Sequence, residues 1–276
     1  MKRFLIKSSL FILILYIVSF AINAIFILAI KNIEVGTFGV INRIARGAIS
    51  TEIIITGSSR AYSHYNPVII EETTGRTCYN IGTNGANLDI IVPKLFFYLN
   101  RNEIPQVIVH DLSLHELNDL NDTIFEPYLY LPYLDDGDLY SGLSKIDKNL
   151  WIHKYIPIFN LYYFNLDLQG ALIRELFVFR SNENDFLIRG FRPEIHQWTE
   201  YAENWVRKTS PFRYEIREEG IDLLQSQIEV CKERNIELIF VVSPMYHEAV
   251  DKIINANAII RTYRDMAARN DCHFLS

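Results

Sequence analysis

Residues 51–61 read TEIIITGSSRA, a run of β-branched residues that ends in a glycine and two serines. A short, continuous apolar run is typical of a strand buried on both faces of a parallel sheet, and we expect it to be the first strand of a domain. The turn after it places Ser59 at the start of a helix. Its hydroxyl would then either lie exposed at the carboxyl edge of the sheet or simply cap that helix.

Strands and helices alternate on either side of this run. The pattern predicts helices over 64–72, 88–100 and 214–234, and strands over 77–80, 106–110 and 236–242. Such alternation indicates an α/β domain with a mostly parallel sheet and helices on both faces. Binding residues should collect beyond the carboxyl ends of the strands, where a glycine-rich loop occupies residues 81–85.

A membrane-spanning helix is predicted near the N-terminus. Residues 10–30, LFILILYIVSFAINAIFILAI, contain no charge and have the length that a helix needs to cross hydrocarbon. Lys2, Arg3 and Lys7 precede them, so the positive-inside rule predicts a single-pass signal anchor with a cytoplasmic N-terminus and an extracytoplasmic domain. A cleaved signal peptide is the alternative, but its apolar region usually covers only about 7–15 residues.

The predicted organisation has three parts. A cytoplasmic tip and anchor cover residues 1–32, a juxtamembrane connector covers 33–50, and the α/β domain covers 51–276. Within that domain, residues 118–210 interrupt the alternation and are rich in aromatic side chains. We expect them to form a mainly helical insertion near one edge of the sheet.

Composition limits the classes of partner and cofactor. The formal net charge is -6 and the pI is about 5.7, which gives no footprint for nucleic acid. The three cysteines are widely spaced and read as small buried hydrophobes, with a Cys78–Cys231 bridge as the alternative. His110, Asp111 and His115 are too isolated a group to predict a metal site, and no cofactor is predicted.

The serine and glycine motifs together resemble those of the SGNH (GDSL-like) hydrolase family, in its membrane-anchored, extracytoplasmic branch. Gly57-Ser58-Ser59 is similar to the first block of that family and Asn80–Ala86 to the second. The resemblance implies a flavodoxin-like strand order and makes Ser59 the nucleophile. It also implies that Gly85, or alternatively Gly82, presents an N–H to the oxyanion, and that Asn84 could donate as well.

Two departures from the family pattern leave the acid–base pair open. Residues 107–113 occupy the place of the third block but lack its asparagine, and no Asp-x-x-His follows Pro244. The sequence stops at residues 270–276, which look like the start of the last strand, so we expect either a truncated chain or a protein without the pair. His247, which follows a strand end, is one candidate base; His64, near Ser59 in sequence, and His110, at the end of the middle strand, are the others. Arg60 and Asp111 are the candidates for substrate binding.

The resemblance and the anchor together imply a function. The expected activity is removal or transfer of acyl groups, acetyl among them, on an extracytoplasmic polysaccharide. The alternative is a non-catalytic envelope protein of the same fold that binds glycan or protein, and a structural membrane protein is a third reading. The expected partners are the bilayer, through residues 10–30, and cell-surface polysaccharide or its assembly proteins.

Overall fold

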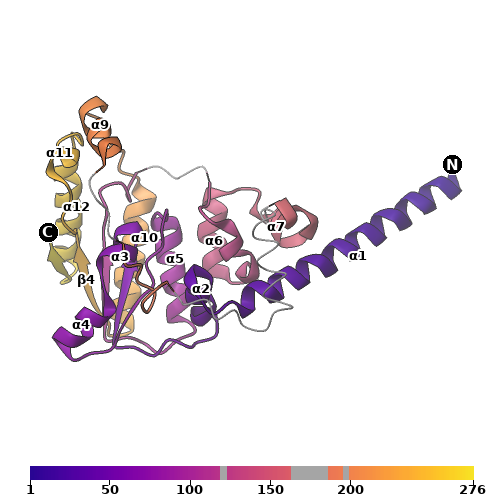
Figure 1. Cartoon of the computed structure of the whole chain (residues 1–276), viewed down its shortest axis with the longest axis horizontal. Helices are drawn as coiled ribbons and strands as arrows, with labels where there is room; N and C mark the ends of the chain where they lie inside the picture. The colour runs from indigo at the N-terminus through magenta and orange to yellow at the C-terminus, as the bar shows by residue number, and fades with distance from the viewer. Residues whose placement is uncertain (119–122, 163–185, 195–198) are drawn as a thin grey trace.

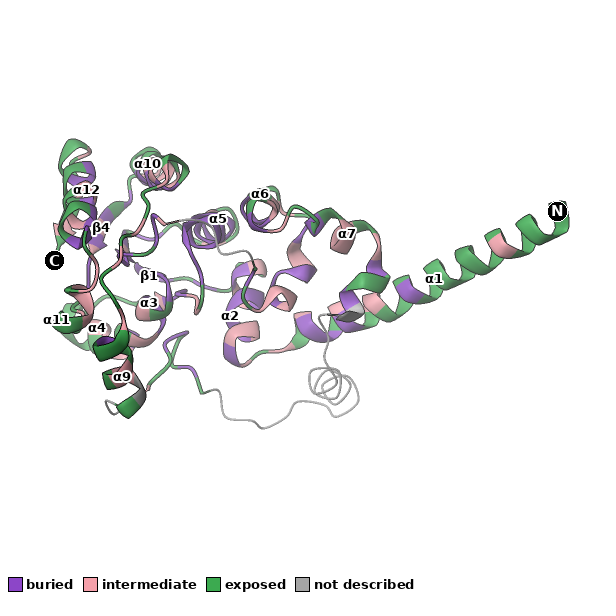
Figure 2. Ribbon diagram, turned by 90° about the horizontal axis from the view of Figure 1, so that it is seen from above, coloured by how far each residue is buried: buried purple, intermediate pink, exposed green. Residues whose placement is uncertain are grey.

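A computed structural model describes residues 1–118, 123–162, 186–194 and 199–276. Figure 1 shows an α/β body from which helix α1 (Lys2–Asn32) extends as a long rod. By length and composition α1 could cross a membrane. Most of its apolar side chains are exposed, as Figure 2 shows along its outer length.

The sheet has five strands, all parallel, in the order β2-β1-β3-β4-β5. This confirms the predicted fold class and the flavodoxin-like order. The strands are β1 (Ile53–Gly57), β2 (Cys78–Asn80), β3 (Val107–Asp111), β4 (Glu237–Val241) and β5 (His273–Leu275). β1 lies between β2 and β3, and its last residue, Gly57, pairs with Asp111. The strand ends therefore meet beside Ser59.

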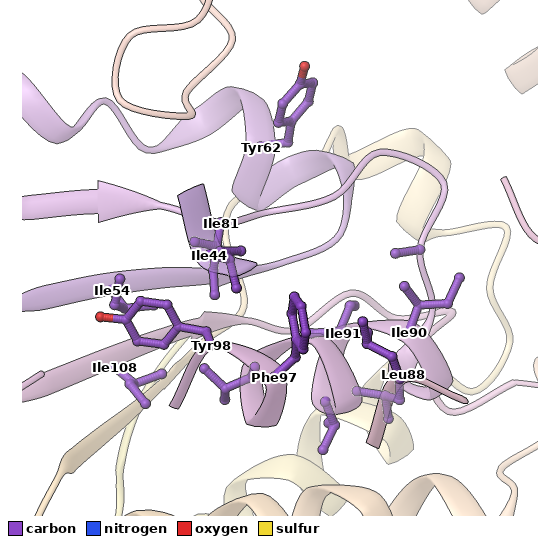
Figure 3. Packing of buried hydrophobic residues seen from close by; sticks show 14 of the residues in the cluster. Ile44, Ile54, Tyr62, Ile81, Leu88, Ile90, Ile91, Phe97, Tyr98 and Ile108 are labelled. Atoms are coloured by element: carbon purple, nitrogen blue, oxygen red, sulfur yellow. The ribbon is translucent and has the colours of Figure 1, made fainter. Parts of the chain in front are cut away.

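Alternate residues of the strands pack against helices on opposite faces. One face contacts α3 (Ser59–His64) and α4 (Pro67–Thr74) through a small cluster that includes Ile53, Ile55 and Val107. The other face packs into the main core under the helices α5 (Leu88–Leu99), α10 (Glu218–Glu233) and α12 (Ala256–Arg269). In Figure 3, Ile54 and Ile108 of the sheet lie beside the ring of Tyr98 on α5.

Two helices differ from the predicted ranges because polar residues interrupt them. The helix expected over 64–72 begins only at Pro67, as α4, and His64 instead ends α3. Pro67 disfavours helical backbone at Asn66, and the Asn66 side chain caps α4 by accepting from Val68 N at 3.0 Å. The helix expected from residue 214 begins at Glu218, since Tyr214 N donates to Asn255 Oδ1 at 3.1 Å.

The connector over 33–50 contains a helix, α2 (Gly36–Ala45), that belongs to the core. Val40, Ile41 and Ile44 lie on one face of α2 and are buried. The buried Asn42 side chain donates to Ile30 O at 2.6 Å and to Ile33 O at 2.8 Å. It thus supplies additional donors to carbonyls at the end of α1. These contacts join the end of α1 directly to the domain.

The described part of the insertion consists of short helices. They are η1 (Pro127–Leu129), η2 (Leu131–Tyr133), α6 (Gly137–Ile146), α7 (Leu150–Tyr155), η3 (Pro157–Tyr162) and α9 (Glu200–Lys208). A further short helix, α11 (His247–Val250), follows β4. α6 packs closely on α5, and α7 lies beside α1 (Figure 1). Residues 186–194 form a loop with an isolated bridge between Ile188 and Phe191, and residues 119–122, 163–185 and 195–198 lie outside the described residues.

Part of the α3–α4 face of the sheet is open within the described structure. An apolar groove of about 580 Å³ runs over β3, β4 and β5, and its lining includes Val109, Ile239, Val241 and Leu275. These strands carry apolar residues on both faces, a pattern typical of a sheet that is covered by helices on both sides. Here α3 and α4 cover only the part near β1 and β2.

The contact between α5 and α6 supplies a stability test. A Cβ on Gly142 would collide with Asp89 O and with the Pro93 ring, whereas a Cβ on Gly137, at the start of the same helix, meets nothing within 4 Å. We expect Gly142→Ala to lower the free energy of unfolding by about 1–3 kcal/mol because the helices must move apart. Gly137→Ala, the matched control, should change it by less than about 1 kcal/mol. Denaturant unfolding in detergent micelles measures both, and equal effects would contradict the packing.

Candidate functional site

Ser59 and Ser58 occupy different environments at the end of β1. Ser59 is the first residue of α3 and is exposed, whereas Ser58 is 1% exposed and its Oγ lies 3.0 Å from Ser113 Oγ. The N–H groups of a first helical turn have no acceptor within the helix. Ser59 is therefore the serine whose hydroxyl is available to a ligand, next to free backbone donors.

An open pocket of about 380 Å³ lies over Ser59. It is lined by Ser59, Arg60, Tyr62, Ser63, His64, Asn84, Arg192 and Glu194. Every lining residue carries a polar group. The pocket is therefore suited to a polar, hydroxyl-rich ligand rather than to a long apolar chain.

The glycine-rich loop after β2 contributes Asn84 to this pocket. Gly82 N already donates to Asn80 Oδ1 at 2.8 Å, so its N–H is engaged within the loop. Gly85 has φ +65°, and the ring of Phe125 packs against the position that a Cβ on Gly85 would occupy. Of the three oxyanion candidates, Asn84 is the one that shares the pocket with Ser59.

Two buried side chains hold this loop in place. Asn80 Nδ2 donates to Ala61 O at 2.7 Å and thereby joins the loop to α3. Lys94 Nζ, on α5, donates to Ile81 O at 3.0 Å and to Thr83 Oγ1 at 2.7 Å. Burial lowers the pKa of Lys94 to about 7, because a charged amine loses its hydration there.

Arg60 and Asp111 form a buried ion pair. The Arg60 guanidinium donates from Nε and Nη2 to the two Asp111 carboxylate oxygens at 3.3 and 3.2 Å. Tyr65 Oη donates to the same carboxylate at 3.1 Å, and Ser243 donates from N at 3.0 Å and from Oγ at 3.1 Å. Asp111 is fully buried. This carboxylate thus joins structural elements, whereas Arg60 also reaches the pocket wall.

The histidines are divided between the pocket, the core and the surface. His64 lines the Ser59 pocket. The His247 side chain is 78% exposed, lies on α11 and is not part of the pocket lining. His110 is fully buried, and its Nδ1 lies 2.8 Å from Gln227 Oε1 on α10. Of these three, only His64 is placed beside Ser59.

A buried acid lies behind the site. Glu116 is fully buried, and its Oε2 is 3.9 Å from His110 Nε2. Burial, with a further contribution from the Asp111 charge, raises the pKa of Glu116 to about 8, while burial lowers the pKa of His110 to about 4. Both groups are therefore neutral at pH 7.

Sequence reasoning missed Arg192 and Glu194. They form an ion pair on a segment that docks against the edge of the sheet, where Asn80 N donates to Arg189 O at 3.0 Å and Arg192 N donates to Tyr62 O at 2.9 Å. The glycine and proline in the run Arg-Gly-Phe-Arg-Pro-Glu at 189–194 predict a loop. Nothing in the run predicts that this loop contacts β2.

The remaining predictions concern cysteines and metals. Cys78, Cys231 and Cys272 are free thiols, so the alternative Cys78–Cys231 bridge is not formed. Within the described ranges, no three His, Cys, Asp or Glu side chains gather closely enough to hold a metal ion.

Comparison of the chain with protein-family models, with curated proteins and with solved structures finds no match. The geometry of the site itself must therefore carry the functional argument.

The buried ion pair predicts a large loss of stability on its disruption. Asp111→Asn leaves the Arg60 charge without its partner, so we expect the free energy of unfolding to fall by roughly 3–5 kcal/mol. Glu34→Gln, which removes the exposed Glu34–Arg46 pair at 2.6 Å, should cost less than about 1 kcal/mol. Denaturant unfolding compares the two, and similar small losses would show that the buried pair does not hold the strand ends.

Glu116 predicts a pH dependence of stability. Its pKa is 4.5 in the unfolded chain and about 8 in the folded one, so between these values the folded state holds the extra proton. The contribution of Glu116 to stability then falls as the pH rises through this window. Glu116→Gln removes that slope, so the variant should match the wild type near pH 5 and exceed it near pH 8 by on the order of 3 kcal/mol.

Glu72→Gln, at an exposed position on α4, is the control for this measurement. It should leave the difference between the two pH values unchanged in urea titrations. A Glu116→Gln variant whose stability follows the wild type at both pH values would show that Glu116 ionises normally.

Proposed function

We propose that this chain is a membrane-anchored, SGNH-hydrolase-like protein that removes or transfers short acyl groups, such as acetyl, on an extracytoplasmic polysaccharide. The observation that supports the proposal most strongly is the position of Ser59. It is exposed at the carboxyl end of the first strand, in the first turn of a helix and inside a polar pocket that it shares with Asn84.

The proposed chemistry uses the residues around this pocket. Ser59 Oγ attacks the acyl carbon, and the Asn84 amide together with N–H groups of the first turn of α3 stabilises the oxyanion. His64, which lines the same pocket, takes the serine proton and gives it to the sugar oxygen as the ester C–O bond breaks. Water or an acceptor hydroxyl, deprotonated by His64, then attacks the acyl-enzyme, and Ser59 Oγ leaves and regains the proton, which yields hydrolysis or transfer.

Substrate size and polarity follow from the pocket walls. A long acyl chain needs apolar walls, and those around Ser59 are polar throughout. A short acyl group on a sugar presents hydroxyls that Arg192, Glu194 and Asn84 can bind. This supports an acylated glycan as the substrate class.

The proposed location is a bilayer spanned by α1, with the domain on the extracytoplasmic side. Lys2, Arg3 and Lys7 favour that orientation. Phe26, Ala29 and Ile30 of α1 are buried in the domain core. Cleavage of α1 would remove these core residues, which supports an anchor that is retained.

One observation favours the non-catalytic alternative. In a serine hydrolase the base is oriented by a third group, usually a carboxylate. His64 is exposed, and among the described residues no carboxylate forms a hydrogen bond or ion pair with it. A protein that only binds glycan in the Ser59 pocket would need no such group.

Substitution of Ser59 distinguishes the two functions. We expect the full chain in detergent to react with a fluorophosphonate probe and to hydrolyse 4-nitrophenyl acetate, and Ser59→Ala to lower both rates by about 100-fold or more. Ser63→Ala removes another hydroxyl from the same pocket and is the control, with an expected change of less than about threefold.

Wild-type protein that neither labels nor hydrolyses would contradict the enzymatic proposal. Binding of acetylated oligosaccharide that weakens in Arg192→Gln would then support the binding alternative. Equal labelling of wild type and Ser59→Ala would assign the reactivity to another residue.

A further inference from the structure

The described insertion exposes a concentrated apolar surface on α7 and η3. Trp151 is 47% exposed, Tyr155 60%, Ile158 38% and Phe159 49%. We call these four residues the α7–η3 patch. Four large apolar side chains exposed within nine consecutive residues exceed the scattered exposure usual on a soluble surface, and such a cluster marks an interaction site.

The patch lies against α1. Tyr16 Oη donates to Tyr155 O at 3.3 Å, and the buried Asn160 side chain donates to Asn23 Oδ1 at 2.9 Å. Figures 1 and 2 both place α7 beside the domain-proximal part of α1. On α1, Ser19 and Phe26 are buried and, with Asn23, form one stripe at helical spacing. The insertion therefore flanks the apolar helix itself and not only its end.

The position of these contacts along α1 determines their depth in a bilayer. Residues 8–30 form an uncharged run of 23 residues between Lys7 and Lys31, about 35 Å of helix against roughly 30 Å of hydrocarbon. Tyr16 and Asn23 both lie within that run. Even a placement that begins at Phe4 puts the hydrocarbon boundary at Asn23. Tyr16, which contacts Tyr155, then lies about 10 Å further in, so the patch lies at and just inside the domain-side boundary of the membrane.

The chemistry of the patch suits that boundary. Tryptophan and tyrosine have apolar rings with one polar atom and are enriched where hydrocarbon meets headgroups. Residues 149–160 contain no carboxylate, and the exposed Asp135 carboxylate beside them pairs with Lys154 Nζ at 3.3 Å. The Asn23–Asn160 hydrogen bond also shields the polar side chain of Asn23 from lipid.

We infer that the α7–η3 patch is a lipid-binding surface, inserted into the interface of the same bilayer that α1 spans. This inference rests on the span by α1 and is independent of any chemistry at Ser59. The domain then contacts the membrane at two places, through α1 and through the patch.

The test uses the full chain in proteoliposomes and its own tryptophans, of which there are three. Trp198→Phe with Trp205→Phe leaves Trp151 alone. Trp151→Phe with Trp198→Phe leaves Trp205, which is 41% exposed on α9 and thus a matched reporter away from the patch. Vesicles of phosphatidylcholine with bromine at carbons 6 and 7 of one acyl chain quench tryptophans near the interface. Circular dichroism checks that both variants fold.

We expect Trp151 emission to shift to shorter wavelength and to be quenched at least about threefold more than Trp205 emission. Equal quenching of the two reporters would overturn the inference. A blue shift of Trp151 without bromolipid quenching would also overturn it, because the patch would then be covered by protein and not by lipid.

Discussion

The carboxylate of Asp111 is the constraint on which the site depends. A charge buried this completely is costly unless it is paired and hydrogen-bonded, and here Arg60, Tyr65 and Ser243 supply the donors. They come from the start and the end of α3 and from the turn after β4, so satisfying one charge brings α3 and that turn together at the end of β3. Because Arg60 follows Ser59 directly, its attachment to Asp111 also holds the start of α3, where Ser59 lies, at this edge of the sheet.

Much of the fold could be predicted because its signals are local. Buried parallel strands need apolar residues on both faces. The continuous runs at Ile53–Thr56 and Val107–Val109 have this composition and therefore predict such strands. Helix α2 was missed because its apolar face is short and lies between glycines at both ends of the connector. That face is buried only because it packs against α1 and α5. A local sequence pattern does not show these contacts.

Less of the site could be predicted, for a related reason. The sequence predicts Ser59, Asn84 and Asp111 near strand ends but does not show which charges pair. Arg60 could therefore bind substrate or pair with a surface carboxylate, and its partner proves to be the buried Asp111, 51 residues away. The choice among Gly82, Gly85 and Asn84 depends on which N–H is already engaged and where Phe125 packs. Arg192 reaches the pocket through backbone contacts of a distant insertion, and only folding creates that proximity.

The junction between α1 and the domain has a consequence for reach. Many tethered domains hang on slack linkers and sweep a volume set by linker length. Here Asn42 binds the last carbonyls of α1, and Phe26, Ala29 and Ile30 are themselves core residues, so there is no slack. With α1 in a bilayer, the Ser59 pocket would stay at a nearly constant height above the membrane surface as the protein diffuses laterally. It could meet only ligands that pass through that thin layer.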